Sequence, residues 1–244
     1  MILLRSLIFT LYLYGVMAIL AILLLPAVLI WGERPAMWAA RQWSRAALFG
    51  VRIICGIRYE LRGREHLPPG KFIVASKHQA SWETLFFATL FPHPIVVFKK
   101  ELKRFPLYGW YLERSGMIAI DREAGASTLK TMVRAAEAKL APGRPLIIFP
   151  EGTRQPPGAP PDYKPGIAAL YAKLGVPCLP VALNSGLYWE GKGPLRRPGT
   201  ILIELLEPIA PGLPRAEFMA LLETRIETAS ARLLAQARAA KPTT

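Results

Sequence analysis

The chain has few cysteines for its length. Among 244 residues there are two, Cys55 and Cys178, with no CxxC pair and no Cys/His spacing typical of zinc ligands. This usage argues against a disulfide framework and against a structural metal site. We expect both thiols to be small buried side chains, in a catalytic part that faces a reducing cytoplasm. The chain also lacks internal repeats and low-complexity segments, which excludes a repeat architecture.

Acidic residues are also scarce, so the chain is strongly basic. It has 31 Lys and Arg against 17 Asp and Glu, a formal net charge of +14. Such a charge favours anionic partners: nucleic acid, acidic lipid headgroups or phosphorylated substrates. Nucleic acid is disfavoured, because the basic residues are dispersed and no reading module is present. A mean hydropathy of +0.26 is high for a plain soluble protein, and the combination points to a membrane surface.

Charge is absent from one long N-terminal run, Ser6 to Gly32. The run exceeds the roughly 7–15 apolar residues of a secretory signal core, and no convincing cleavage site follows it. It is long enough to span a bilayer, for which about 20 apolar residues suffice. Pro26 lies within it, so a kinked or re-entrant segment is nearly as plausible. We therefore predict a retained membrane segment without specifying its topology.

The next segment, from Pro35 to about Cys55, has the pattern of an amphipathic helix. At about 100° per residue, three of its arginines fall within roughly a 40° arc. One interpretation places these arginines on lipid phosphates and the opposite face in acyl chains. The alternative is a helix packed on the globular part, with its arginines in solvent. The arginine excess after the apolar run places the rest of the chain on the cytoplasmic side of a membrane.

From about residue 56, short apolar runs alternate with helical patterns. This alternation predicts an α/β fold with a mixed sheet of about seven strands flanked by helices. The expected strands are 57–61, 72–76, 95–98, 117–120, 146–149, 178–183 and 201–206, and the expected helices 82–90, 106–113, 124–140, 167–174 and 215–238. We predict two parts: membrane-anchoring helices over residues 1–55 and a catalytic domain over residues 56–244.

His78 and Glu83 are the first candidates for chemistry. On a regular helix, a spacing of five residues separates two side chains by about 140°, so they could not touch. The strand ends just before His78, and Ser81 is a natural N-cap. We therefore place His78 in the turn and Glu83 in the first helical turn, where the carboxylate can reach one imidazole nitrogen and leave the other as a base. A Ser/His/Glu hydrolase using Ser81 lacks the GxSxG motif.

Candidate anion ligands follow two other predicted strands. The segment Phe149–Arg154 places a glycine, a hydroxyl and an arginine directly after an apolar strand, where an anionic group could be held. Arg122 ends another strand, and its guanidinium could bind a phosphate through two parallel hydrogen bonds. Without further context, an ion pair with a neighbouring acid is the simpler reading of Arg122.

In this order, the motifs resemble the lysophosphatidic acid acyltransferase family of glycerolipid acyltransferases over roughly residues 70–190. His78 to Glu83 is similar to the family's H-x-x-x-x-D signature, with Glu as an accepted variant. The other similar segments are Phe98–Leu102 (K-x-E-L), Gly116–Arg122 (G-x-I-x-I-x-R), Phe149–Arg154 (the acceptor-binding motif), Tyr163–Gly166 (aromatic-Lys-x-Gly) and Val176–Asn184 (V-P-x-x-P-V).

The resemblance implies that His78 removes the proton from a glycerol hydroxyl, which then attacks an acyl thioester without a covalent acyl-enzyme. Glu in place of Asp adds one methylene, about 1.5 Å that the pair must absorb. Arg122 and Arg154 would hold the acceptor phosphate, and Glu151 and Gly152 match acceptor-binding positions. Further candidates for substrate binding are Thr153, Lys164 and Lys99. No metal and no cofactor is implied beyond acyl-CoA or acyl carrier protein as carrier of the co-substrate.

The expected function is therefore transfer of a fatty acyl group to the sn-2 hydroxyl of lysophosphatidic acid, giving phosphatidic acid. A related enzyme acting on glycerol 3-phosphate or a lyso-ornithine lipid would share every motif. A non-catalytic protein that binds anionic lipids is the alternative from another class. The expected partners are the two substrates, the bilayer and an acyl carrier protein as one possible donor. We expect the protein at the cytoplasmic face of a bacterial inner membrane.

Overall fold

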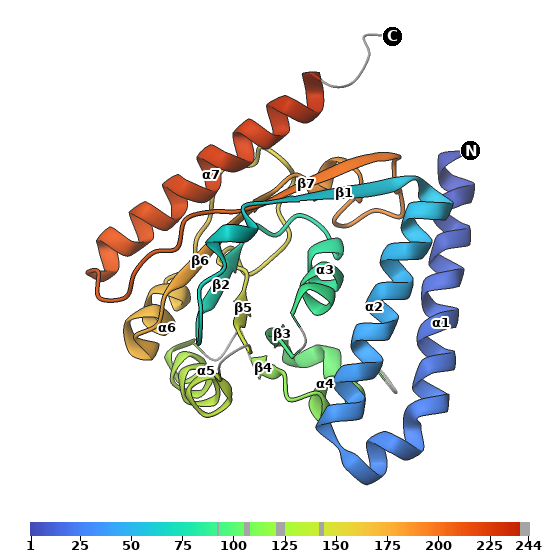
Figure 1. The fold of residues 1–244 in the computed structure, drawn as a ribbon, viewed down its shortest axis with the longest axis horizontal. Helices are drawn as coiled ribbons and strands as arrows, with labels where there is room; N and C mark the ends of the chain where they lie inside the picture. Colours follow the sequence, from blue (N-terminus) through green and yellow to red (C-terminus); the bar gives the residue numbers. More distant parts are fainter. Residues whose placement is uncertain (92, 105–107, 121–124, 142–143, 240–244) are drawn as a thin grey trace.

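Seven strands and seven α-helices follow one another in the part of the chain that the computed structural model describes, residues 1–91, 93–104, 108–120, 125–141 and 144–239 (Figure 1). The strands are β1 (Ile57–Arg62), β2 (Ile73–Ser76), β3 (Ile95–Lys99), β4 (Ile118–Ile120), β5 (Leu146–Ile148), β6 (Cys178–Leu183) and β7 (Gly199–Leu205). The helices are α1 (Ile2–Trp31), α2 (Glu33–Cys55), α3 (Trp82–Leu90), α4 (Tyr108–Arg114), α5 (Gly125–Lys139), α6 (Gly166–Leu174) and α7 (Arg215–Ala239).

The strands form one mixed sheet in the order β1-β7-β6-β2-β5-β3-β4. Neighbouring strands are parallel except β6 and β7, which are antiparallel. The predicted α/β fold with about seven strands is confirmed. Because β2 to β6 all run in the same direction, their carboxyl ends meet at one edge of the sheet. This is the edge at which open α/β sheets place their ligands.

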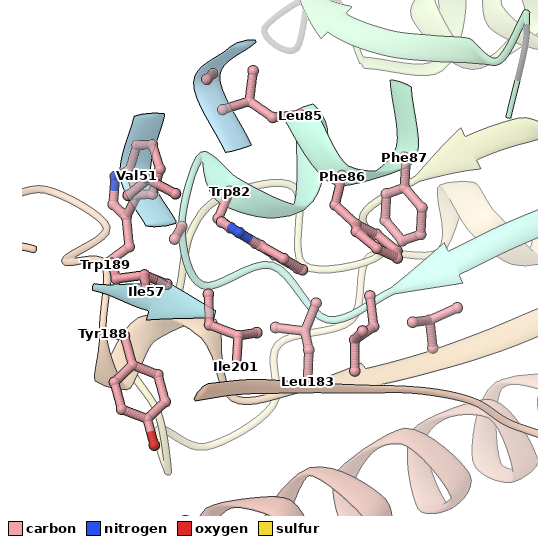
Figure 2. Close-up of a cluster of buried hydrophobic side chains, with 14 of the residues drawn as sticks. Val51, Ile57, Trp82, Leu85, Phe86, Phe87, Leu183, Tyr188, Trp189 and Ile201 are labelled. Carbon is pink, nitrogen blue, oxygen red and sulfur yellow. The ribbon is translucent and has the colours of Figure 1, made fainter. Parts of the chain in front are cut away.

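Helices cover both faces of the sheet, and the strand residues alternate between them. Val74 and Val181 belong to the cluster under α1, α2 and α3. Figure 2 shows this cluster, in which Trp82 and Phe86 of α3 lie over the strands. Ile73 and Cys178 belong instead to the cluster covered by α5, α6 and α7. The central strands are buried on both sides, which explains why their sequences are apolar without alternation.

The N-terminal segment is a pair of antiparallel helices beside the sheet (Figure 1). Helix α1 runs through Pro26 without interruption, so it is one continuous helix rather than a re-entrant loop. It is long and apolar enough to cross a membrane, and 17% of its most apolar window is buried within the protein. Arg196 attaches it to the rest of the chain, since Nη1 of this buried guanidinium donates to Thr10 Oγ1 at 3.1 Å. These features are consistent with membrane association.

Helix α2 corrects one expectation about lipid contact. The face opposite its arginines packs on α1, not in acyl chains: Trp43 Nε1 donates to the Leu13 carbonyl at 3.0 Å, and Gly50 lies against the ring of Tyr12. The amphipathic pattern therefore reflects packing within the protein, with the charged side left at the surface. Arg41 differs from the exposed Arg45, because its guanidinium points back toward the Thr89 carbonyl at 3.4 Å.

Candidate active site

The predicted site residues that the structure describes lie along the carboxyl edge of the sheet. His78 follows β2, the segment Glu151–Arg154 follows β5, and Lys99 is the last residue of β3. The parallel arrangement of these strands brings together motifs that are far apart in the sequence. Arg122 falls outside the described residues.

His78 and Glu83 are in contact, as expected from placing His78 in the turn and Glu83 in the first helical turn. His78 Nδ1 lies 3.2 Å from Glu83 Oε1. Glu83 is the second residue of α3, and its carboxylate turns back over the preceding loop. The same oxygen accepts the backbone N–H groups of Gln79 at 2.5 Å and Ala80 at 2.8 Å. The extra methylene of Glu is thus accommodated by a carboxylate that reaches back to the turn.

Ser81 corresponds to the predicted N-cap position, but its side chain makes no capping hydrogen bond. The Glu83 carboxylate binds two N–H groups that precede the helix, those of Gln79 and Ala80. A carboxylate is the stronger acceptor for these groups, and its charge is favoured at a helix N-terminus. Ser81 is thus the N-cap residue of α3 by position, without the side-chain hydrogen bond that usually accompanies this position.

Ser185 is a site residue that the sequence analysis missed. It follows β6, and its hydroxyl donates to Glu83 Oε2 at 2.9 Å. Glu83 is fully buried, so both of its oxygens need donors, and Ser185 supplies the donor for the second. The only signal was position: Ser185 comes directly after the V-P-x-x-P-V strand segment that ends at Asn184.

The imidazole is fixed by a ring as well as by the carboxylate. The ring of Phe149 stacks on His78 with centroids 3.9 Å apart and an angle of 19° between the planes. The His78 side chain is 15% exposed. We infer that Nδ1 carries the hydrogen shared with Glu83, because the carboxylate can only accept. This tautomer leaves the lone pair of Nε2 available for a proton.

The loop after β5 is hydrogen-bonded to the backbone around His78. The Gln155 N–H donates to the His78 carbonyl at 2.8 Å. Gly152 has φ +66°, a conformation that favours glycine, and this turn leaves Thr153 and Arg154 exposed. The Arg154 guanidinium donates to the Gly191 carbonyl. An arginine that can fork onto an anion is thereby held on the loop that contacts the base.

The two lysine candidates differ in how closely they join this group. The Lys164 N–H donates to the Pro150 carbonyl at 2.9 Å, and its ammonium pairs with Asp162 at 2.6 Å. Lys164 therefore belongs to the loops around Gly152. Lys99 is half exposed and lies 3.8 Å from Glu101, a contact within its own segment. No described contact connects Lys99 with His78 or Arg154.

Glu151 is placed differently from an acceptor-contacting residue. Its side chain is 1% exposed, and Oε1 lies 2.7 Å from the buried ammonium of Lys77. Oε2 accepts the His78 N–H at 3.4 Å. Burial raises the pKa of the Glu151 carboxyl, and the ion pair with Lys77 opposes that rise. Glu151 thus fixes the backbone of the site through its hydrogen bond with the His78 N–H.

Known proteins are similar to this chain in sequence and in fold. A family model described as "Acyltransferase" matches residues 58–184, slightly more than half of the chain. The chain is 39% identical over 166 residues to the 1-acyl-sn-glycerol-3-phosphate acyltransferase of Pseudomonas aeruginosa, a match covering 68% of this chain and 65% of that protein. It is 32% identical over 143 residues to the human alpha form of the enzyme with this name, covering 58% of this chain and 50% of that one.

A solved structure is similar over the full length of both chains. It is the 1-acyl-sn-glycerophosphate (LPA) acyltransferase PlsC from Thermotoga maritima, with a TM-score of 0.77 and 22% sequence identity. At this identity the likeness establishes the fold. The sequence matches cover less than two thirds of the length of each of the two relatives above.

Proposed function

Because the chain belongs to the acyltransferase family, we propose that it moves a fatty acyl group from an acyl thioester to the sn-2 hydroxyl of lysophosphatidic acid. The product is phosphatidic acid, and the free thiol is released. The observation that carries the proposal is the contact of His78 Nδ1 with the buried Glu83 carboxylate, next to the loop that holds Arg154. The relatives named for this activity support the choice of acceptor.

His78 acts as the general base in this scheme. Its Nε2 takes the proton of the acceptor hydroxyl as the oxygen attacks the thioester carbonyl. The C–S bond then breaks, and the imidazolium returns the proton to the departing thiolate. Glu83 stabilises the imidazolium through Nδ1 and keeps the ring in the required tautomer. The acyl group passes directly to the acceptor, so no nucleophilic side chain is needed.

Arg154 is our proposed ligand for the acceptor phosphate, together with Arg122. An arginine can make two parallel hydrogen bonds to a phosphate, which fixes the acceptor in position as well as neutralising its charge. The exposed Thr153 and Lys164 lie on the same loops and are proposed as further contacts. Lys99 is retained as a candidate from its sequence motif alone.

We further propose that residues 1–55 anchor the enzyme to the cytoplasmic face of a bacterial inner membrane and residues 56–244 catalyse the transfer. The apolar surface of α1 supports anchoring, because a membrane-bound enzyme can draw its acceptor from the bilayer and return the product to it. The cytoplasmic side supports either acyl-CoA or acyl carrier protein as the donor.

The direct test is acyl transfer from a labelled thioester to lysophosphatidic acid by detergent-purified protein. We expect product with the wild type and a loss of about 10²-fold or more with His78→Ala, the contribution of general base catalysis. Wild-type-like turnover by His78→Ala would contradict the base assignment. If product formed only with glycerol 3-phosphate or with lyso-ornithine lipid, that compound would replace lysophosphatidic acid as the proposed acceptor. Binding of anionic lipid by both proteins without turnover would favour the non-catalytic alternative.

Arg154→Ala tests the phosphate ligand. We expect the KM for lysophosphatidic acid to rise about tenfold or more, since a hydrogen bond to a charged group contributes about 1.5–3 kcal/mol. The KM for the acyl thioester should stay near the wild-type value. Arg197→Ala is the matched control, because this exposed arginine pairs with Glu190 on the neighbouring loop. An effect of Arg154→Ala confined to the acyl donor would show that the ligand is misassigned.

A further inference from the structure

A network of charged and polar side chains lies beneath the active-site loops, buried at Lys77 and Glu151 and partly exposed at Tyr163 and Glu227. The ammonium of Lys77, a side chain that is 2% exposed, contacts Glu151 Oε1 at 2.7 Å and Glu227 Oε1 at 2.8 Å. The Tyr163 hydroxyl donates to the same Glu227 oxygen at 2.9 Å. Glu227 comes from α7, outside the segment matched by the family model. Three of the four residues have no role in the proposed reaction: Lys77, Tyr163 and Glu227.

Three of the network residues, those other than Glu227, directly precede a residue or segment with a proposed role in the reaction. Lys77 precedes the base His78, Glu151 precedes the segment that ends at Arg154, and Tyr163 precedes Lys164. The three loops therefore share one buried anchor. Glu227 of α7 links two of these loops, because one of its oxygens, Oε1, accepts from both Lys77 and Tyr163.

The backbone of His78 is held by the same assembly. Its N–H donates to the second oxygen of Glu151, and its carbonyl accepts the Gln155 N–H at 2.8 Å. A shift of Lys77 or Glu151 would therefore move the base relative to the loop that holds Arg154. The Lys77–Glu151 pair is buried, so its geometry depends on the other groups that contact Lys77, among them Glu227.

We propose that Glu227 of α7 is a positioning residue for the acyl transfer: through Lys77, Glu151 and Tyr163 it aligns the base with the phosphate-binding loop. The inference rests on the function proposed above. The C-terminal helix, which lies along the sheet in Figure 1, thereby belongs to the catalytic apparatus without contacting substrate.

The test compares Glu227→Ala with Glu227→Gln in the detergent-purified, full-length protein. Alanine removes the shared acceptor oxygen, and we expect kcat to fall about tenfold, because small misplacements of reacting groups are costly. The KM for the acyl thioester should not change. Glutamine keeps an oxygen in the same place and should restore most of kcat. Glu217→Ala, at an exposed glutamate on the same helix, is the matched control and should behave as wild type.

Amide hydrogen exchange tests the proposal without depending on substrate. In Glu227→Ala, peptides covering the His78 turn and residues 151–155 should exchange faster than in wild type. Peptides from β6 should keep their protection. Tyr163→Phe, which removes the hydroxyl that Glu227 accepts and keeps the ring, should show a weaker form of the same pattern and remains informative if Glu227→Ala fails to fold.

Two results would overturn the proposal: wild-type kcat and exchange in Glu227→Ala, or a loss of protection spread evenly over the whole chain in both Glu227→Ala and Tyr163→Phe. The second result would mean that Glu227 only stabilises the fold. An inactive wild type together with locally increased exchange in Glu227→Ala would refute the proposed reaction and leave the positioning network intact.

Discussion

Four donors meet the Glu83 carboxylate, and one of them comes from a distant part of the chain. Three belong to the turn that Glu83 itself closes, and the fourth is the Ser185 hydroxyl. A buried carboxylate with this many donors keeps one orientation. The orientation of His78 therefore depends on Ser185, although the two side chains have no described contact with each other.

Ser185→Ala should weaken both stability and catalysis. The variant leaves one oxygen of a buried carboxylate without its donor, and we expect the free energy of unfolding to fall by about 1.5–3 kcal/mol. Turnover should fall roughly tenfold, a part of what general base catalysis contributes. Denaturant unfolding and steady-state kinetics measure the two effects.

Ser115→Ala is the matched control, because this buried serine donates to the Leu112 carbonyl outside the site. We expect it to lose some stability and to keep wild-type kcat. Equal kcat values in the Ser185→Ala and Ser115→Ala variants would contradict a role of Ser185 in orienting Glu83.

At the scale of elements, the close pairing of α1 and α2 depends on a glycine. Gly50 of α2 lies against the Tyr12 ring, where an added Cβ would overlap the ring atoms. The Tyr12 hydroxyl also donates to the Ala46 carbonyl at 3.0 Å. The small residue lets the two helices approach, as small residues do in membrane helix pairs.

Gly50→Ala should therefore separate the helices despite the better helix propensity of alanine. We expect a loss of about 1–3 kcal/mol in stability from overpacking, seen as a lower unfolding temperature in detergent. Gly15→Ala is the control, because nothing lies within 4 Å of its added Cβ. That change should be neutral or stabilise by up to about 1 kcal/mol. A higher unfolding temperature for both variants would mean that the Tyr12 ring moves aside without cost.

At the scale of the whole molecule, the two thiols report on the fold. Both cysteines are buried, as their scarcity and spacing suggested, and Cys178 lies on the central strand β6 with no exposed surface. Burial raises the pKa of the Cys178 thiol well above its ordinary range. The folded protein therefore keeps this thiol protonated at a pH where the unfolded chain ionises it.

Reaction of Cys178 with a thiol reagent should require global unfolding. In a Cys55→Ala background at about pH 8, near the ordinary thiol pKa, we expect labelling to follow the denaturant unfolding curve. Since the folded pKa is raised, stability is fully present below the unfolded pKa and falls as the pH rises above it. Fast labelling without denaturant would show that β6 opens locally.

The fold was largely predictable, because its signals are local. The strand Cys178–Leu183 and the helix Trp82–Leu90 have the predicted bounds, and the other boundaries agree within a few residues. The signals are apolar runs of strand length, proline and glycine at helix ends, and the change from strand to helix between His78 and Glu83. Each acts within a short stretch of chain. For the same reason, the contact of His78 with Glu83 could be predicted.

The sequence by itself determined the class of fold, the membrane-compatible N-terminus, and the motifs of the base and the anion-binding loop. Only the tertiary structure decided what surrounds them: the Ser185 hydroxyl on Glu83, the burial of Glu151 against Lys77, and the contribution of Glu227 from α7. It also decided that the inner face of α2 packs on α1 rather than in lipid. These contacts join residues up to 150 positions apart, and no local pattern encodes which strand ends meet at one edge of a sheet.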